Sequence, residues 1–204
     1  MPATGGEPVV RRRRRGMELQ DAIHQAVLGE LQEHGYAALS MDGVASRAQT
    51  GKATLYRRWP SKLELVVDAF KHSAPDTKPP ADSGDLREEL LAVLRHEADS
   101  LDGASGAAAR GLMAELVRTP ELARVVRPFL ADPFLAPMME VLRRAAVRGE
   151  IPVAALTPRI AAVGPDIVRQ HAMINGTPVP PEVLVEVVDD VVLPLLRGIG
   201  IART

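Results

Sequence analysis

Apolar residues recur at helical spacing along most of the chain. The first run begins at Met17, and Gly35 follows it where a C-terminal helix cap is expected. Its apolar positions fall on one helical face, at Leu19, Ile23, Ala26, Val27 and Leu31. The pattern therefore predicts an amphipathic helix from Met17 to about His34.

Three short helices are predicted next. The first begins after Ser40, a residue type that caps helix N-termini. The second spans residues 52–59 and ends at Pro60, which cannot continue a helix. The third opens with a capping box at residues 61–64, with Ser at the cap and Glu three residues later, and runs to about His72.

Beyond a proline-containing linker at residues 74–85, helical signals repeat towards the C-terminus. Further helices are predicted over about 86–102, 105–118, 121–130, 133–148, 158–175 and 181–197. Gly164-Pro165 is expected to kink or break the fifth of these helices. No segment shows the alternation typical of a strand. The pattern predicts an all-α fold with an N-terminal three-helix helix-turn-helix domain and a C-terminal helical bundle.

The same pattern divides the chain into an arm and two domains. Residues 1–16 contain Pro, Gly and the run Arg11–Arg15, whose like charges repel each other, so we expect a disordered arginine-rich arm there. The helix-turn-helix domain is predicted at residues 17–73 and the C-terminal helical domain at residues 85–204. The arm either contacts the DNA backbone or minor groove or serves only as a solubilising tail.

Composition excludes several kinds of protein. The chain has no cysteine, so disulfides and thiolate metal sites are excluded. The arginine run is not followed by an apolar stretch, so it is not a signal peptide, and no stretch approaches about 18 uninterrupted apolar residues. We therefore expect a cytoplasmic protein without a membrane partner.

Neither a metal nor a cofactor is expected, because no two histidines have the spacing of metal ligands. The histidines are His24, His34, His72, His96 and His171.

The distribution of charge indicates a polyanionic partner. The whole chain has a net charge of −1, but residues 40–62 hold five basic side chains against one acid, Asp42. A local excess of cations on a nearly neutral protein suggests one surface that faces nucleic acid. Two short helices joined by a tight turn can place the second helix in the DNA major groove. Hydrogen-bond donors on that second helix are Lys52, Thr54, Tyr56, Arg57 and Arg58.

Residues 39–65 carry the most specific motif of the chain. Its elements are Val44-Ala45, Ala48, Lys52-Ala53-Thr54-Leu55-Tyr56, Trp59, Ser61-Lys62 and Leu65. In these residues the segment resembles the DNA-binding domain of the TetR family of bacterial one-component regulators, and the resemblance covers about residues 17–72. Gln49 stands where the family usually has Gly, and Gly51 where Ser or Thr is common. Gln49 is expected to cost little stability provided that its φ is negative.

The resemblance implies that nine residues contact double-stranded DNA. Residues 50–53 would open the recognition helix onto bases and phosphates. Tyr56 and Lys62 would bind phosphates, and Ser40 and Arg47 would hold the flanking DNA backbone. The full set is Ser40, Arg47, Thr50, Gly51, Lys52, Ala53, Tyr56, Arg57 and Lys62.

The resemblance also implies a homodimer that responds to a small-molecule effector. The last two helices, residues 158–175 and 181–197, would form the dimer interface, and a broad Val/Leu stripe on the second of them fits that role. Soft and aromatic side chains are suited to an adaptable effector pocket, although plain core packing explains them as well. The candidates for the pocket are His96, Arg110, Met113, Phe129, Phe134, Met138 and His171.

The predicted function is sequence-specific DNA binding by a transcription regulator, a ligand-responsive repressor that binds a palindromic operator as a dimer. The alternative is a small helical ligand-binding protein or enzyme with an incidental basic patch. Against an enzyme, the sequence has no Gly-rich phosphate loop, no nucleophile–base pair and no pair of carboxylates in a convincing context. A nonspecific nucleoid protein would be basic overall, whereas this chain is slightly acidic.

Overall fold

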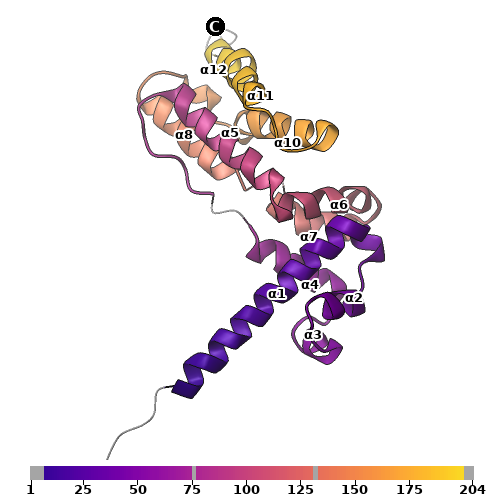
Figure 1. Ribbon diagram of the computed structural model, residues 1–204. Coiled ribbons are helices and arrows are strands. Elements are labelled where there is room, and N and C mark those ends of the chain that lie inside the picture. The colour runs from indigo at the N-terminus through magenta and orange to yellow at the C-terminus, as the bar shows by residue number, and fades with distance from the viewer. Residues whose placement is uncertain (1–6, 75–76, 131–132, 200–204) are drawn as a thin grey trace, which may run out of the picture. The chain divides into compact units, whose positions relative to one another are not determined.

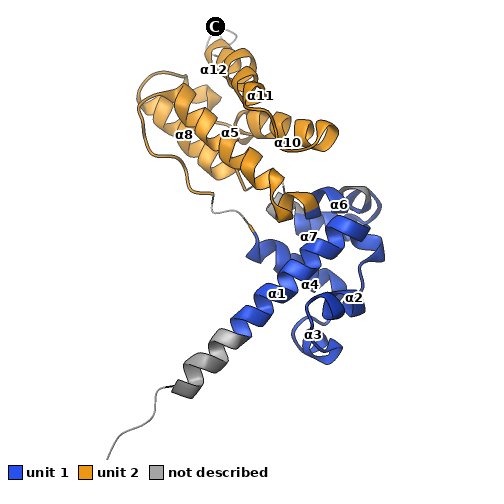
Figure 2. Cartoon of the chain, in the orientation of Figure 1, with its two compact units in different colours: residues 1–73, 108–126 blue, residues 74–107, 127–204 orange. Residues whose placement is uncertain are grey.

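Helices make up every regular element of the described residues in the computed structural model (Figure 1). The structure describes residues 7–74, 77–130 and 133–199, and within these ranges the side chains of all but residues 7–15, 113–114 and 127–130. The chain forms two compact units (Figure 2). Unit 1 takes in residues 1–73 and 108–126, and unit 2 takes in residues 74–107 and 127–204. The predicted all-α fold is confirmed.

Unit 1 begins with four helices in the predicted order. They are α1 (Glu7–Ala38), α2 (Met41–Arg47), α3 (Lys52–Arg58) and α4 (Lys62–His72). Both α2 and α4 pack against α1, and α3 packs against α2. The fully buried apolar side chains of α1, α2 and α4 include Val27, Leu31, Val44, Leu65 and Val66. Burial of this apolar stripe is the main force that holds α1 and its neighbours together.

The first helix begins at Glu7, earlier than the predicted start at Met17. The expectation of a disordered arm over residues 1–16 was therefore wrong for the backbone of residues 7–16, whereas residues 1–6 lie outside the described residues. Arginine has a high helix propensity, and extending an existing helix fixes only one more residue for each new hydrogen bond. The side chains of Arg11–Arg15 lie outside the described residues, so the two alternative roles of this run stay open.

At its C-terminal end α1 leaves helical geometry at Gly35, which has φ 72° and ψ 173°. Glycine adopts a positive φ without the steric penalty that a Cβ atom brings. The predicted cap residue is therefore the point at which the chain turns away from the long helix and towards α2.

Unit 1 also contains residues 108–126, which come from α6 (Ala104–Arg118) and α7 (Pro120–Leu130). Gly111 permits a close approach of α6 to α1, because a Cβ atom there would lie 2.1 Å from the carbonyl oxygen of Leu31. We predicted one uninterrupted C-terminal domain over residues 85–204, and this segment departs from that expectation. The apolar periodicity of a helix shows which face is buried but not which partner covers it.

Unit 2 is a helical bundle with its own core. Its longest helices are α5 (Leu86–Asp102), α8 (Leu135–Val147) and α10 (Val163–Asn175). Both α8 and α10 pack against α5. The shorter elements are the 3-10 turn η1 (Val153–Ala155), α9 (Pro158–Ala161), α11 (Pro181–Glu186), the π-helical turn η2 (Val187–Val192) and α12 (Leu193–Gly198). The apolar core joins side chains of all three long helices to those of the C-terminal segment.

Proline residues set the breaks in unit 2. The helix predicted over residues 158–175 is divided into α9 and α10, and Pro165 lies in the first turn of α10. Because Pro165 has no N–H, it cannot bond back to the preceding turn, and the predicted break is confirmed. Pro194 likewise stands at the second residue of α12, directly after the π-helical turn η2. A π-helical turn replaces the usual i→i−4 hydrogen bonds by i→i−5 bonds, and Pro194 has no N–H with which to make the usual bond. The helix predicted over residues 133–148 begins at Leu135.

Two glutamates are buried in unit 2, and both have arginine partners. Glu89 lies 2.9 Å from the guanidinium of Arg144 and 3.3 Å from that of Arg148. Glu97 accepts from Nη1 of Arg169 at 2.5 Å. Burial raises the pKa of Glu97 to about 8, although the attraction of Arg169 for the carboxylate acts in the opposite direction. Such pairs fix the packing of α5 on α8 and α10.

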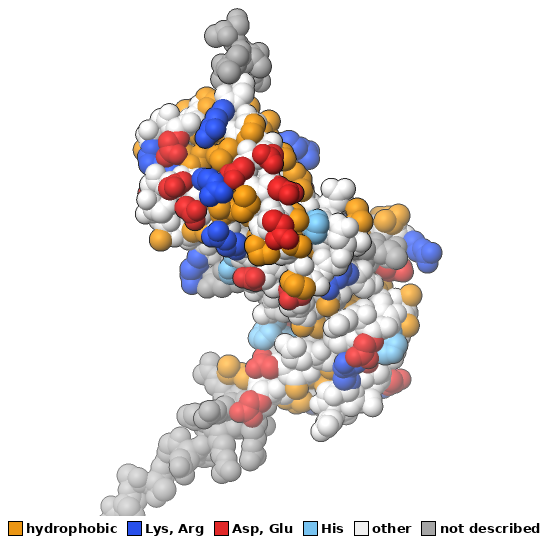
Figure 3. All heavy atoms as spheres, turned by 45° about the horizontal axis from the view of Figure 1, so that its top comes forward, with side chains coloured by type: hydrophobic (Ala, Val, Ile, Leu, Met, Phe, Trp, Pro, Cys, Tyr) orange, Lys and Arg blue, Asp and Glu red, His pale blue; other side chains and the backbone are white. Residues whose placement is uncertain are grey.

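On the face of unit 2 visible in Figure 3, acidic and basic side chains are interspersed, with apolar side chains exposed among them. Within the described residues, no helix combines the length and the apolar character that crossing a bilayer requires.

Candidate nucleic-acid interface

A tight turn at residues 48–51 joins α2 to α3. The amide of Gln49 donates to the carbonyl of Ser46 at 3.1 Å, and the amide of Thr50 donates to the carbonyl of Ala45 at 2.9 Å. These two bonds form a Schellman motif, in which the residue after the helix cap is left-handed. That residue is Gln49, with φ 51°, so the condition under which it would cost little stability is not met. A non-glycine residue in this conformation costs about 1 kcal/mol.

The recognition helix α3 has one buried and one exposed face. Leu55 is fully buried and Trp59, which ends the helix, is 4% exposed, whereas Tyr56 is 46% exposed. The other exposed residues of the predicted set on this helix and its cap are Gly51, Lys52, Ala53 and Arg57. Leu55 and Trp59 thus anchor one side of α3, and Tyr56 lies on the opposite, exposed side.

A hydrogen-bonded chain supports α3 from behind. The indole Nε1 of Trp59 donates to Oδ2 of Asp68 at 2.9 Å, and Nε2 of His24 lies 3.0 Å from the same oxygen. Burial opposes ionisation of Asp68, but the hydrogen bonds from Trp59 and His24 outweigh it, so the pKa of Asp68 lies below its usual value. Burial also lowers the pKa of His24, against the pull of Asp68. The chain links α1, α3 and α4.

The cations on the exposed face of α3 differ in their surroundings. Nζ of Lys52 lies 2.8 Å from a carboxylate oxygen of Asp42 and 5.8 Å from the centroid of the Tyr56 ring. The hydrogen bond to Asp42 raises the pKa of Lys52. Arg57 is exposed and makes no ion pair with another described residue. An exposed pair such as Lys52–Asp42 is weak, so a phosphate can replace the carboxylate as the partner of Lys52.

Two predicted DNA-binding residues have partners inside the protein. Arg47 donates to both carboxylate oxygens of Glu33, at 2.8 and 2.6 Å, and thereby clamps α2 to α1. Lys62 donates to the carbonyl of Tyr36 at 2.9 Å, and its ammonium lies 4.3 Å from the centroid of that ring. Lysine has three N–H donors, so one bond to Tyr36 leaves donors for a phosphate. In this structure Arg47 and Lys62 thus join α2 and α4 to α1.

The remaining predicted residues lie at helix starts. Ser40 is the N-cap of α2, and its hydroxyl oxygen accepts from the amide of Gly43 at 3.0 Å. Thr50 is half-buried in the turn before α3. Sequence reasoning missed the acidic partners Asp42 and Glu33, and it did not foresee that Arg58 bonds to Gln20. No local signal marks these pairs, because each joins two different helices.

Two of the predicted effector residues line the same cavity. In unit 2, His96 and Phe134 line one cavity of about 160 Å³, and their ring centroids are 5.6 Å apart. Met138 is 2% exposed and belongs to the apolar core of that unit, as the alternative of plain packing expected. His171 faces Asn175 near the end of α10, with 3.3 Å between their side-chain nitrogens.

Three further candidates are not among the residues that line the His96 cavity. Arg110 belongs to unit 1, and the side chains of Met113 and Phe129 lie outside the described residues. The His96 cavity therefore rests on part of the predicted set and on lining residues that the sequence did not single out. These are Thr77, Lys78, Pro80, Ala92, Val93 and Pro137.

Both halves of the chain match family models. Residues 24–69 match the model described as bacterial regulatory proteins of the tetR family, and residues 80–191 match the model of the tetracyclin repressor-like C-terminal domain. The first match contains α2, α3 and most of α4 together with the turn described above.

Similar proteins support the same assignment. An uncharacterised HTH-type transcriptional regulator of Mycobacterium tuberculosis is 36% identical over 171 residues, which cover 83% of this chain and 84% of that protein. The DNA-binding transcriptional repressor TetR of Mycobacteroides abscessus is 35% identical over 191 residues, covering 90% and 96%. A TetR family regulator from Pseudomonas syringae pv. tomato has a solved structure with a TM-score of 0.61 at 26% identity, covering 87% and 94% of the two chains. The chain belongs to the TetR family of bacterial transcription regulators.

Proposed function

We propose that this protein represses transcription by binding a palindromic DNA operator as a homodimer, with α3 of each subunit in the major groove. The observation that carries the proposal is the division of α3 into a face anchored by Leu55 and Trp59 and a face that presents Lys52, Tyr56 and Arg57 to solvent. A short rod of this kind fits a groove about 12 Å wide. Repression is the activity that the name of the Mycobacteroides abscessus relative gives to that protein.

In this proposal, the exposed face of α3 supplies two kinds of contact. Arg57 and Lys52 meet phosphates or base edges, and the Tyr56 hydroxyl fixes the register of the helix against a phosphate. The amides of Gly51 and Lys52 at the start of α3 are directed at the same DNA backbone, since helix N-termini favour anions. Thr50 and Ala53 lie beside these groups in sequence, and with Ser40, the N-cap of α2, they complete the proposed surface.

A dimer is proposed through residues 158–175 and 181–197. Exposed apolar side chains in these segments support it: Met173 is 50% exposed, Ile174 72%, Val191 39% and Leu195 37%. These exposed apolar groups lie on segments that pack against each other, and an apolar surface shared by neighbouring segments suits association with a second copy. Two copies also place two recognition helices on symmetric half-sites, which doubles the number of bases that are read.

An effector is proposed to bind unit 2 and to weaken DNA binding. The cavity beside His96 and Phe134 combines an aromatic wall with polar groups, which is the character of a small-molecule site. Its volume of about 160 Å³ suits a compact molecule. Half-sites of an operator lie about 34–36 Å apart, and the dimer binds DNA only in a conformation whose two recognition helices match that distance. A ligand releases the DNA only if it binds more tightly to a conformation in which the helices do not match it.

Selection of bound sequences from random duplex DNA tests this proposal. The expected product is a palindrome whose half-sites have centres one helical turn, about 10 base pairs, or a multiple of it apart. The same selection with Arg57→Ala should recover a weaker or altered palindrome. Recovery of no enriched sequence would contradict the proposal and would favour an incidental basic patch on a helical ligand-binding protein.

A further inference from the structure

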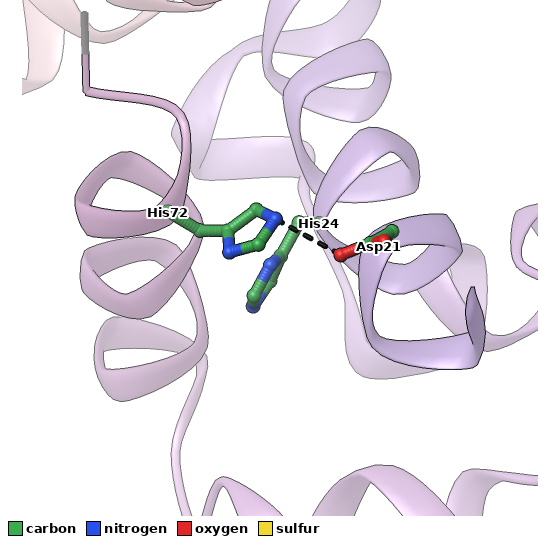
Figure 4. A group of neighbouring side chains, drawn as sticks. All are labelled: Asp21, His24 and His72. Carbon is green, nitrogen blue, oxygen red and sulfur yellow. Dashed lines mark ion pairs between the residues drawn. The ribbon is translucent and has the colours of Figure 1, made fainter. Parts of the chain in front are cut away.

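Two imidazoles and one carboxylate meet between α1 and α4 (Figure 4). Asp21 and His24 lie three residues apart on α1, and His72 reaches towards them from the last turn of α4. Nε2 of His72 is 2.9 Å from Oδ1 of Asp21, and the two imidazole centroids are 4.5 Å apart. One ligand-type atom from each of the three residues lies within 4.8 Å of the others.

The buried member of this cluster has one nitrogen without a partner. His24 is 1% exposed, and its Nε2 is held by Asp68, but its buried Nδ1 has no hydrogen-bond partner. Asp68 also accepts from Trp59, and an ionised carboxylate can only accept, so Nε2 of His24 carries the proton. The lone pair of a neutral imidazole must then be on Nδ1. A histidine whose outer N–H is fixed by a carboxylate is prepared as a metal ligand.

We propose that Asp21, His24 and His72 bind one divalent transition-metal ion, for which Zn²⁺ is the best fit. Two imidazole nitrogens and a carboxylate oxygen form a donor set that zinc accepts at about 2.0–2.2 Å. Asp21 and His72 are 56% and 46% exposed, so their side chains can rotate to close the set around an ion. Three protein ligands leave a fourth position for water, as in zinc sites that exchange their ligand.

The proposed ion would be connected to the end of α3. Behind His24, the carboxylate of Asp68 joins the imidazole to the indole of Trp59, which is the C-cap residue of α3. A metal at Nδ1 strengthens the hydrogen bond on the opposite side of the ring, because it makes the Nε2 proton more acidic. Occupancy of the site should therefore be detected at Trp59, the single tryptophan of the chain.

The test uses the full-length protein without an affinity tag, titrated with ZnCl₂ alone. Calorimetry should give one ion per chain, and the emission of Trp59 should change at the same ratio. His72→Gln and Asp21→Asn, both at exposed positions that the fold tolerates, should each weaken Zn²⁺ binding at least tenfold and abolish the change in emission at low micromolar Zn²⁺.

His34→Gln is the matched control, because His34 is also an exposed imidazole of α1 beside a carboxylate, 3.6 Å from Glu30, and lies outside the cluster. This variant should bind Zn²⁺ like the parent. Equal affinity in the parent, His72→Gln and Asp21→Asn would overturn the proposal, as would the absence of both heat and a Trp59 response at about 100 µM Zn²⁺. The experiment contains no DNA, so its outcome is independent of the proposed operator binding.

Discussion

Gln49 is the residue at which the backbone and the side chain of the helix-turn-helix are least compatible. With φ 51°, it occupies the left-handed position of a turn that glycine accepts without strain. We expect Gln49→Gly to raise the free energy of unfolding by about 0.5 kcal/mol, because the relieved strain of about 1 kcal/mol exceeds the roughly 0.5 kcal/mol lost through the added freedom of the unfolded chain. Denaturant unfolding followed by the fluorescence of Trp59, which lies in the same unit, measures the effect.

The matched control is Gln32→Gly, at an exposed position within α1. In a regular helix the same replacement should lower stability by about 1 kcal/mol. A loss of stability in both variants would show that Gln49 is not strained in solution.

The hydroxyl of Tyr56 gives the second prediction at residue scale. Tyr56→Phe should weaken binding to every duplex alike by about 1 kcal/mol, close to fivefold, because a phosphate contact carries no information about sequence. Fluorescence anisotropy with the selected operator and with a scrambled duplex measures both affinities. Tyr36→Phe removes the same group from the other tyrosine of the chain, which is half-buried, and should leave both affinities unchanged. Parental affinity in Tyr56→Phe would remove this phosphate contact from the proposed interface.

At the scale of helices, the contact between α5 and α10 is expected to depend on pH through Glu97. Its carboxyl ionises near pH 8 in the folded protein, against an ordinary value of 4.5. Between these pH values the folded chain holds a proton that the unfolded chain has lost, so this group makes stability fall as pH rises, by at most about 1.4 kcal/mol per pH unit. Arg169 and Asp166 are the charged groups that face it.

Glu97→Gln should therefore lose less stability than the parent between pH 6 and pH 9. Calorimetric unfolding at several pH values follows the difference between the two proteins. Glu88→Gln, on the exposed side of the same helix, should retain the parental dependence. Parallel pH profiles for the parent and Glu97→Gln would mean that Glu97 stays ionised beside Arg169.

Local signals explain why the limits of several helices could be predicted. Ser40 and Ser61 each cap the helix that was predicted to follow them, since a cap bonds to an amide only a few residues away. The pairing of His24 with His72 could not be predicted in this way, because it depends on the packing of α4 on α1. Spacing along the sequence gave no sign of these two histidines as neighbours. The left-handed φ of Gln49 could not be predicted from the residue itself, because glutamine adopts that conformation far less readily than the glycine usual in the family.

At the scale of the whole molecule, the proposed dimer depends on apolar groups that a single chain leaves exposed. Leu195→Asp, on α12, should weaken dimerisation at least tenfold, because an interface would have to bury an unpaired carboxylate. Sedimentation at micromolar concentration distinguishes monomer from dimer. Val153→Asp is the control, since Val153 is 73% exposed and lies outside both proposed interface segments. A parent protein that sediments as a monomer would rule out the dimer itself.

The placement of residues 108–126 in unit 1 has a consequence for engineering this protein. The chain passes between the two units three times, after residues 73, 107 and 126. A fragment that stops at the linker would lack Leu112, Leu122 and Val126, which are almost completely buried in the intact chain, and would open the surface of α1 that Gly111 approaches. Residues 1–73 alone therefore do not make up the whole of unit 1. A chimera that transfers the DNA-binding specificity to another regulator requires the exchange of two separate stretches of sequence, residues 1–73 and 108–126.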